Sequence, residues 1–234
     1  MDANENHSFD VDDTLYDQLK PFRQAFTATF AFKNIPLEKL YTLSRKLSDQ
    51  VFAASASGTI SMQAMYIYRI QKALAHFDHR ISAQQAQIFQ QNYQHYQQQI
   101  QLLPDVIATL NYCQARQFGL GIITNGPTAH QKAKIAQLGL HRWIKPSHIM
   151  ISGAVGVAKP APQIFQLTAA HLHLTPATTY YIGDSFANDI IGAKQAGWHT
   201  IWLNRRQHQI HNANAYADHI VPADHILTAV IKTL

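Results

Sequence analysis

The sequence has a single cysteine, Cys113, among its 234 residues. One cysteine excludes an intramolecular disulfide framework, so a reducing compartment is the simplest expectation. The chain also lacks any run of the roughly 20 apolar residues that a membrane-spanning helix needs. Its first eight residues are polar and acidic, without the apolar segment of a signal peptide. These absences predict a cytoplasmic protein with no membrane partner.

Charged residues are scarce at 14%, and basic residues exceed acidic ones to give a net charge of +5. Nucleic-acid binding usually requires clustered lysine and arginine with interleaved aromatic residues. Here the cations are scattered, and the densest pair is Arg205-Arg206. The sequence therefore predicts no nucleic-acid partner. The basic balance fits either a weak attraction for small anionic substrates or an ordinary solvated surface.

From about residue 102 onward, short apolar runs alternate with helical patterns. The expected strands are 120–124, 149–151, 179–182 and 200–203. The expected helices are 105–117, 128–138, 162–172 and 187–196. Alternation at this spacing predicts an α/β fold, in which a parallel sheet is covered by helices on both faces.

The preceding segment, from residue 16 to residue 101, has helical periodicity throughout. Leu19, Phe22 and Phe26 form one apolar stripe, and apolar residues also recur every three or four positions in the Gln-rich stretch 84–101. An all-helical block near the start of an α/β domain is an insertion. We predict a catalytic core of residues 1–15 and 102–234, and a helical cap of residues 16–101.

Asp10 and Asp12 follow the short segment that must supply the first strand. In an extended strand end, residues i and i+2 project to the same side, so the two carboxylates are expected to be neighbours. Such a pair suits a nucleophile with a general acid/base, or a divalent metal site. Helix N-capping by this Asp-rich segment is the alternative.

Three further polar groups follow expected strands. Asp184 and Asp189 come directly after the strand at 179–182 and add oxygen ligands for a hard cation. Thr124 and Asn125 end another strand, where a hydroxyl and backbone N–H groups can hold a phosphate. Lys159 precedes a proline and the start of a helix. Each signal also fits helix capping or a solvated side chain, but together and in this order they indicate one site.

The ordered pattern Asp-x-Asp-x-Thr, Thr, Lys and Gly-Asp-x-x-x-x-Asp resembles the haloacid dehalogenase-like hydrolase superfamily. The resemblance covers the whole chain, and the phrases at 121–126 and 155–160 look like its pyrimidine 5′-nucleotidase-type branch. It implies a Rossmann-like parallel sheet with helices on both faces and an inserted all-helical cap. It also implies a phosphatase for small phosphomonoesters resembling nucleoside 5′-monophosphates.

The resemblance implies a role for each motif residue. Asp10 would attack phosphorus, and Asp12 would protonate the leaving alcohol and then deprotonate water. The phosphoryl oxygens would be held by Thr124, Asn125 and Lys159. A magnesium ion would be bound by Asp10, Asp12 (through its backbone carbonyl), Asp184 and Asp189. An acid at position 12 argues for phosphate esters, because dehalogenases of the superfamily have no alkoxide to protonate.

Two features depart from the family pattern. The strand before Asp10 should be an apolar run, yet residues 4–9 are mostly polar, which predicts a shortened first strand and reduced stability. Ala161 stands where an acid usually follows Lys-Pro, which predicts the loss of a helix-cap contact worth about 1 kcal/mol.

Other functions remain open at this point. A sugar-phosphate phosphatase and a phosphomutase would share the fold and the motifs. A non-catalytic binding protein is the reading from a different class, and the polar first strand is its only support. The expected partner is a small phosphorylated metabolite, and the expected state is a monomer or a homodimer.

Overall fold

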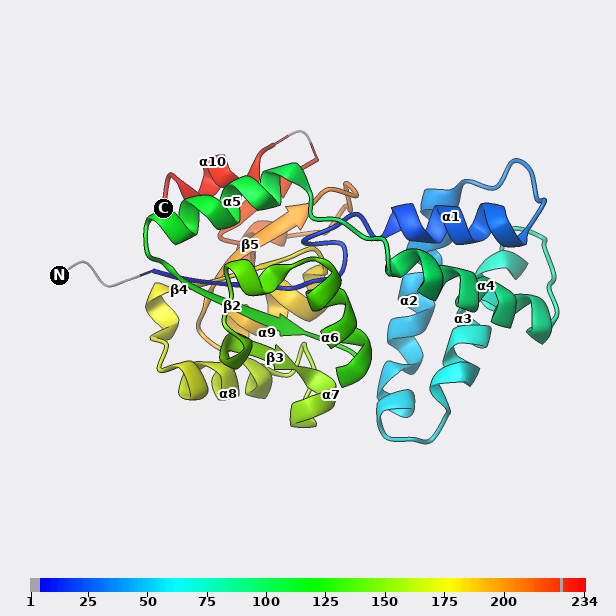
Figure 1. Ribbon diagram of the computed structural model, residues 1–234, viewed down its shortest axis with the longest axis horizontal. Helices are drawn as coiled ribbons and strands as arrows, with labels where there is room; N and C mark the ends of the chain where they lie inside the picture. The colour runs from blue at the N-terminus through cyan, green and yellow to red at the C-terminus, as the bar shows by residue number, and fades with distance from the viewer. Residues whose placement is uncertain (1–4, 224) are drawn as a thin grey trace. The chain divides into compact units, whose positions relative to one another are not determined.

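The computed structural model describes residues 5–223 and 225–234, which divide into two compact units (Figure 1). The core unit comprises residues 1–17 and 101–234, and the helical unit comprises Gln18–Ile100. Among the described helices, none combines the length and hydropathy needed to cross a membrane.

The core unit is built on a six-stranded parallel sheet with the order β3-β2-β1-β4-β5-β6. The strands are β1 (Asn6–Phe9), β2 (Gly119–Thr124), β3 (Ile149–Ile151), β4 (Thr179–Gly183), β5 (His199–Asn204) and β6 (His219–Pro222). The predicted fold class is confirmed. The edge strand β6 was not predicted, because its four residues show neither an apolar run nor alternation.

Helices cover both faces of this sheet (Figure 1). They are α5 (Pro104–Ala115), α6 (Thr128–Gln137), α7 (Ser152–Val155), α8 (Pro162–Leu172), η4 (Phe186–Ile190, a π-helix), α9 (Ile191–Gln195) and α10 (Leu227–Ile231). Short 3₁₀ segments are η1 (Leu140–Arg142), η2 (Pro146–His148), η3 (Pro176–Thr178) and η5 (Ala213–Ala215). On one face α5 and α10 pack together, and Thr109 and Thr228 share a hydrogen bond of 2.8 Å.

The other face is closed by a cluster of buried side chains that joins β2 and β4 to α8 and α9. Its members are Ile123, Ile164, Phe165, Tyr181, Ala193 and Trp198. The helix α8 begins after Ala161, which makes no side-chain cap hydrogen bond, so the predicted loss of the cap contact is confirmed. The packed cluster holds α8 in place without that cap.

The helical unit contains α1 (Leu19–Thr29), α2 (Leu37–Ala56), α3 (Met62–Ala75) and α4 (Ala83–Gln97). The apolar stripe of α1 is buried, and Phe22 meets the ring of Phe89 edge-on at 5.2 Å. The Gln-rich segment forms α4, which begins with a reciprocal capping box between Ser82 and Gln85. The glutamines do not prevent folding, because the buried stripe of α4 consists largely of its few aromatic and aliphatic residues.

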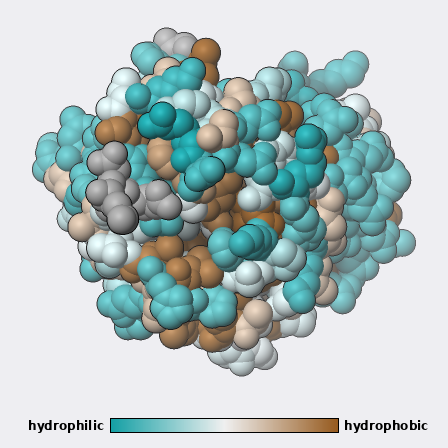
Figure 2. Space-filling model, turned by 60° about the vertical axis from the view of Figure 1, so that its left-hand side comes forward, coloured by the Kyte–Doolittle hydropathy of each residue, from teal (hydrophilic) through white to brown (hydrophobic). Residues whose placement is uncertain are grey.

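Hydrophobic residues reach the surface in small numbers. Figure 2 shows one face on which hydrophilic residues cover much of the area and hydrophobic residues emerge in separate groups. Among the residues that the structure describes, the exposed large hydrophobic side chains are Ile88, Ile107, Leu167, Ile210, Tyr216 and Ile226. Scattered exposure of this kind is normal for a folded chain and by itself indicates no interface.

The first strand lies at the centre of the sheet although its sequence is polar. β1 has four residues and pairs with β2 on one side and β4 on the other. The adjacent strand makes room for its polar side chains: a Cβ at Gly119 would collide with Asn6, and one at Gly121 would lie 2.9 Å from Ser8 Oγ. The strand is therefore short within the described residues, and glycines on β2 accommodate the side chains of Asn6 and Ser8. Residue 4, where the polar segment begins, lies outside the described residues.

His7 is the least favourable residue of β1. It is fully buried, its ring stacks between Phe118 and Tyr180 at 5.2 and 5.3 Å, and neither ring nitrogen has a hydrogen-bond partner among the described residues. Burial lowers the pKa of His7 to about 4. The neutral imidazole therefore occupies the strand at neutral pH, and protonating it opposes folding.

Replacing His7 with phenylalanine keeps the stacked ring and removes the unsatisfied nitrogens. We expect His7→Phe to raise the free energy of unfolding at pH 7 by about 1 kcal/mol or more. Between pH 6.5 and 4, His7 binds a proton in the unfolded chain but not in the folded one. The free energy of unfolding of the wild type therefore decreases as the pH is lowered through this window. The advantage of the variant should therefore grow by up to about 3 kcal/mol as the pH is lowered to 4.

Urea unfolding at pH 7, 5.5 and 4 measures this difference. The exposed His211→Phe serves as the control and should follow the wild type at every pH. A constant difference between His7→Phe and wild type across the series would contradict the assignment of a buried neutral histidine.

Candidate active site

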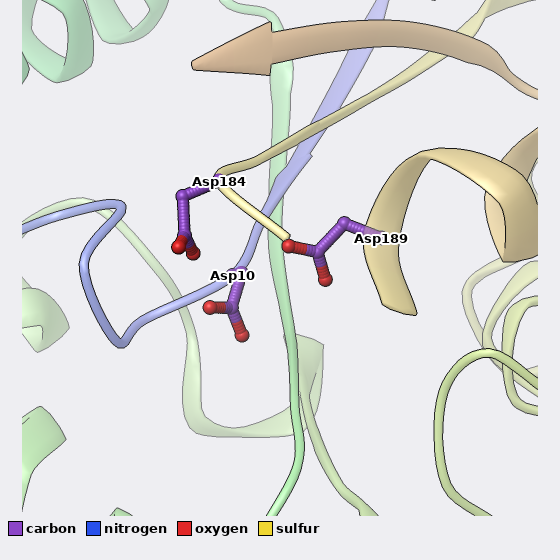
Figure 3. Close-up of side chains that lie close together, drawn as sticks. All are labelled: Asp10, Asp184 and Asp189. Carbon is purple, nitrogen blue, oxygen red and sulfur yellow. The ribbon is translucent and has the colours of Figure 1, made fainter. Parts of the chain in front are cut away.

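Three carboxylates meet at the carboxyl edge of the two central strands (Figure 3). Asp10 follows β1, Asp184 follows β4, and Asp189 lies in η4; one oxygen from each lies within 4.8 Å of the others. Because β1 and β4 are parallel neighbours, their carboxyl ends open at the same edge of the sheet, where ligands of open α/β sheets bind.

Lys159 contacts two of these three carboxylates. Its Nζ donates to Asp10 Oδ1 at 2.7 Å, to Asp189 Oδ1 at 2.6 Å and to the Tyr181 hydroxyl at 2.8 Å. Burial alone would lower the pKa of Lys159, but the carboxylates of Asp10 and Asp189 outweigh it and hold that pKa well above its ordinary value. The site therefore contains a permanent positive charge in contact with two carboxylates.

Asp10 is more weakly acidic than an ordinary aspartate. Burial raises its pKa to about 6, an effect that Lys159 opposes and that the charges of Asp189 and Asp12 reinforce. At neutral pH the side chain is still mainly a carboxylate. Its Oδ1 accepts from Lys159, while Oδ2 makes no hydrogen bond within the described part of the chain. One oxygen is thus held in place and the other is available for chemistry.

The position of Asp189 depends on the tight turn after β4. Ser185 caps η4 through its side chain, and its backbone N–H donates to Asp189 Oδ2 at 2.9 Å. Gly183 allows this carboxylate to fold back, because a Cβ at position 183 would collide with it. Both oxygens of Asp189 are therefore engaged, one by Lys159 and one by the backbone.

Thr124 and Asn125 end β2 beside this cluster and are used differently. The Thr124 hydroxyl is buried and has no hydrogen-bond partner among the described residues. The Asn125 side chain forms a reciprocal pair with the Lys159 backbone, accepting from its N–H at 2.9 Å and donating to its carbonyl at 2.8 Å. The Asn125 amide therefore holds the lysine loop in place, and its expected contact with a phosphoryl oxygen stays a prediction.

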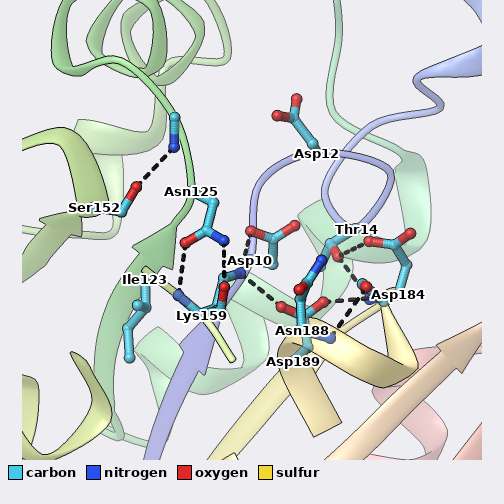
Figure 4. A network of polar contacts seen from close by, with 12 residues as sticks. Asp10, Asp12, Thr14, Ile123, Asn125, Ser152, Lys159, Asp184, Asn188 and Asp189 are labelled. Atoms are coloured by element: carbon cyan, nitrogen blue, oxygen red, sulfur yellow. Dashed lines mark hydrogen bonds and ion pairs between the residues drawn. The ribbon is translucent and has the colours of Figure 1, made fainter. Parts of the chain in front are cut away.

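Asp12 is close in sequence to Asp10 but its carboxylate lies outside the acidic cluster. Figure 4 shows its side chain directed away from Asp10 and Lys159. Its two carboxylate oxygens accept hydrogen bonds from Lys134 Nζ at 2.6 and 2.7 Å. The extended geometry assumed from the sequence does not apply here. β1 ends at Phe9, and Asp13 has a left-handed φ of 56°, so the chain turns away from the strand direction.

Several side chains of the site were not predicted from the sequence. Thr14 shares hydrogen bonds with the Asp184 side chain and backbone, and the Tyr181 hydroxyl donates to the Ile123 carbonyl at 2.6 Å. Thr14 belongs to the Asp-x-Asp-x-Thr motif and could have been assigned from it. Tyr181 and Lys134 lie within an ordinary strand and an ordinary helix, and only the folded chain shows their contacts.

The acidic cluster fits a divalent cation that prefers oxygen ligands. Three carboxylates and one ammonium leave two negative charges in a largely buried place, which favours binding of a cation of charge two. Asp10 and Asp184 are the residues best placed to hold it, since Asp189 is engaged by Lys159 and Ser185.

Comparison with known proteins places this arrangement in a family. A sequence profile of haloacid dehalogenase-like hydrolases matches residues 8–197. A glyceraldehyde 3-phosphate phosphatase of Methanopyrus kandleri is 38% identical over 106 residues, which span 45% of each chain and so less than half of that relative. The corresponding phosphatase of Methanothermobacter thermautotrophicus is 26% identical over 216 residues and 84% of each chain.

Solved structures agree on the fold. The Bacillus subtilis putative HAD-hydrolase YfnB, determined with bound magnesium, has a TM-score of 0.72 at 24% identity and covers 99% of this chain and 98% of its own. A dehalogenase superposes with a TM-score of 0.77 at 18% identity over 100% of this chain and 98% of its own. Since the family profile spans most of the chain and includes all the strand-end motifs described above, this protein belongs to the haloacid dehalogenase-like hydrolases.

Proposed function

We propose that this chain is a magnesium-dependent phosphatase that hydrolyses small phosphomonoesters through an aspartyl-phosphate on Asp10. The observation that supports it best is the buried contact between Asp10 and Lys159 inside a cluster of carboxylates. Phosphoryl transfer requires positioning and charge neutralisation around a nucleophile, and this cluster supplies both. The two sequence relatives described above are named as phosphatases, which agrees with the proposal.

In the first step, the free oxygen of Asp10 attacks phosphorus while the bond to the leaving oxygen breaks. Lys159 keeps the carboxylate oriented and offsets the charge of the phosphoryl group. The unpartnered Thr124 hydroxyl is available as a donor to a phosphoryl oxygen. Asp12, in its protonated form, transfers its proton to the departing alkoxide and becomes a carboxylate. Water then attacks the aspartyl-phosphate, and Asp12 takes its proton as phosphate is released.

Asp10 and Asp184, with the backbone carbonyl of Asp12, would hold the magnesium ion. Asp189 would complete the site either as a ligand or by fixing Lys159 in place. The bound cation would supply charge stabilisation for the phosphoryl oxygens. Before it binds, the arrangement of Asp10 and Asp189 is already maintained by Lys159.

Two substrate classes follow from different observations. The motif phrases at 121–126 and 155–160 resemble nucleotidases and favour nucleoside 5′-monophosphates. The names of the relatives favour short sugar phosphates, since they include glyceraldehyde 3-phosphate phosphatase and ribulose-1,5-bisphosphate 5-phosphatase. The four helices of Gln18–Ile100 are the expected source of this selectivity, by analogy with closing lids in other enzymes. A cytoplasmic location and a monomeric or dimeric state belong to the same proposal.

Phosphate release from a panel of nucleotides and sugar phosphates tests the activity. We expect turnover with magnesium, none with EDTA, and none for Asp10→Asn, which lacks the nucleophilic carboxylate. Asp78→Asn is a matched control: the residue is exposed in the helical unit, and its left-handed φ of 62° suits asparagine. A folded protein that binds magnesium but hydrolyses no ester in the panel would contradict the proposal and favour the phosphomutase or the binding protein.

Metal binding can be tested without activity. Magnesium should raise the melting temperature of the wild type, because a ligand that binds only the folded state stabilises it by mass action. In Asp184→Asn the apparent affinity for magnesium obtained from this shift should fall at least about tenfold, since one carboxylate ligand is lost while the side-chain shape is kept. Asp78→Asn again serves as the control. Equal magnesium shifts in Asp184→Asn and wild type would remove Asp184 from the metal site.

A further inference from the structure

Asp12 is held by three side chains that none of the strand-end motifs contains. Lys134 Nζ contacts both of its oxygens at 2.6 and 2.7 Å, and Gln131 Nε2 donates to Oδ2 at 3.1 Å. The Tyr16 hydroxyl donates to Oδ1. The Lys134 side chain is 4% exposed and the Asp12 side chain 15%, so this ion pair is far less solvated than an ordinary surface pair.

Gln131 and Lys134 both lie on α6, the helix that follows the end of β2. Residues three apart share a helix face, so one face of α6 presents both side chains to Asp12. The same Gln131 nitrogen donates to the Asn125 carbonyl at 2.8 Å. Gly126 permits this approach, since a Cβ there would lie 2.8 Å from Gln131 Nε2. Through these contacts α6 ties the turn after β2, where phosphate is expected, to the carboxylate of Asp12.

The arrangement restricts how Asp12 can move. A lysine that contacts both oxygens through charge-assisted bonds fixes the plane of the carboxylate as well as its position. An Asp side chain after the end of a strand would otherwise rotate among its rotamers. Catalytic groups lose about 100-fold in rate when displaced by about 1 Å. Catalysis by Asp12 therefore requires a fixed orientation, and the contacts from α6 and Tyr16 provide it in addition to the surrounding loop.

We propose that Lys134 is a positioning residue for Asp12. It holds the carboxyl group of Asp12, which takes up a proton before the reaction, gives that proton to the leaving oxygen and regains one from water; Gln131 and Tyr16 add further contacts. Lys134 remains an ammonium throughout and exchanges no proton. This inference rests on the proposed phosphatase function, because it assigns Asp12 as the acid and base of that reaction.

The test compares two leaving groups in Lys134→Met. An alkyl ester, the best substrate of the panel, needs protonation of its leaving oxygen, whereas p-nitrophenyl phosphate needs little. We expect the rate of leaving-group release in a single turnover, which excludes the water step common to both esters, to fall about 100-fold for the alkyl ester and less than about tenfold for the aryl ester. Lys134→Arg should restore most of the alkyl activity. The control is Lys132→Met, an exposed lysine on the same helix, which should behave like wild type.

A double-variant cycle separates positioning from other roles. If Lys134 acts through Asp12, Lys134→Met should slow Asp12→Asn by no more than about twofold, since the contact it supports is already gone. A full additional loss in the double variant would overturn the inference. An equal loss on both esters, accompanied by a lowered melting temperature, would also overturn it and leave Lys134 with a structural role.

Misfolding of Lys134→Met and absence of phosphatase activity in the wild type give different results. If Lys134→Met does not fold, Gln131→Met takes its place, with a smaller loss again confined to the alkyl ester; a loss on both esters would count against the inference. If the wild type hydrolyses neither ester, the phosphatase function itself fails, and that result is seen before any variant is made. Selective loss in Asp12→Asn without selective loss in Lys134→Met would overturn the role of Lys134 while the proposed function stands.

Discussion

The ion pairs of Lys159 with Asp10 and Asp189 are the interaction on which the acidic site depends. Two buried carboxylates this close together repel each other unless a nearby cation offsets their charge. The ammonium group removes most of that repulsion while leaving one oxygen of Asp10 uncommitted. Three separate chain segments meet at this nitrogen: the end of β1, the loop before α8, and η4. The charge of one side chain thus links the edge of the sheet to the helix that follows β4.

The backbone around this lysine is arranged to keep it there. Asn125 binds the Lys159 backbone from the end of β2, and Tyr181 accepts from its Nζ within the buried face of β4. Gly183 lets the Asp189 carboxylate return toward the lysine. These contacts come from the end of β2, from within β4 and from the turn after β4, so the parallel sheet is what makes the cluster possible. A disturbance of any one strand end is expected to reach the others through Lys159.

Much of this could be predicted from the sequence. Apolar runs located four of the six strands, two of them with Thr or Asp at their carboxyl ends, and strand ends of a parallel sheet must meet at one edge. The alternation of side chains along a strand does not extend to Asp12, because β1 ends at Phe9. The expectation that the Asp12 side chain lies beside Asp10 was therefore wrong. Local patterns could not reveal Lys134 or Tyr181, because their partners are more than 20 residues away and nothing nearby marks them.

The short central strand shows how two neighbouring strands have become mutually dependent. Asn6 and Ser8 on β1 occupy the space that Gly119 and Gly121 leave on β2. Larger apolar side chains at positions 6 and 8 would have to fit into the space that Gly119 and Gly121 leave. A chain that regained larger residues on β2 would meet the polar side chains of β1. Substitutions on these two strands are therefore expected to be tolerated in pairs, because a change of side-chain size on one strand requires a matching change on the other.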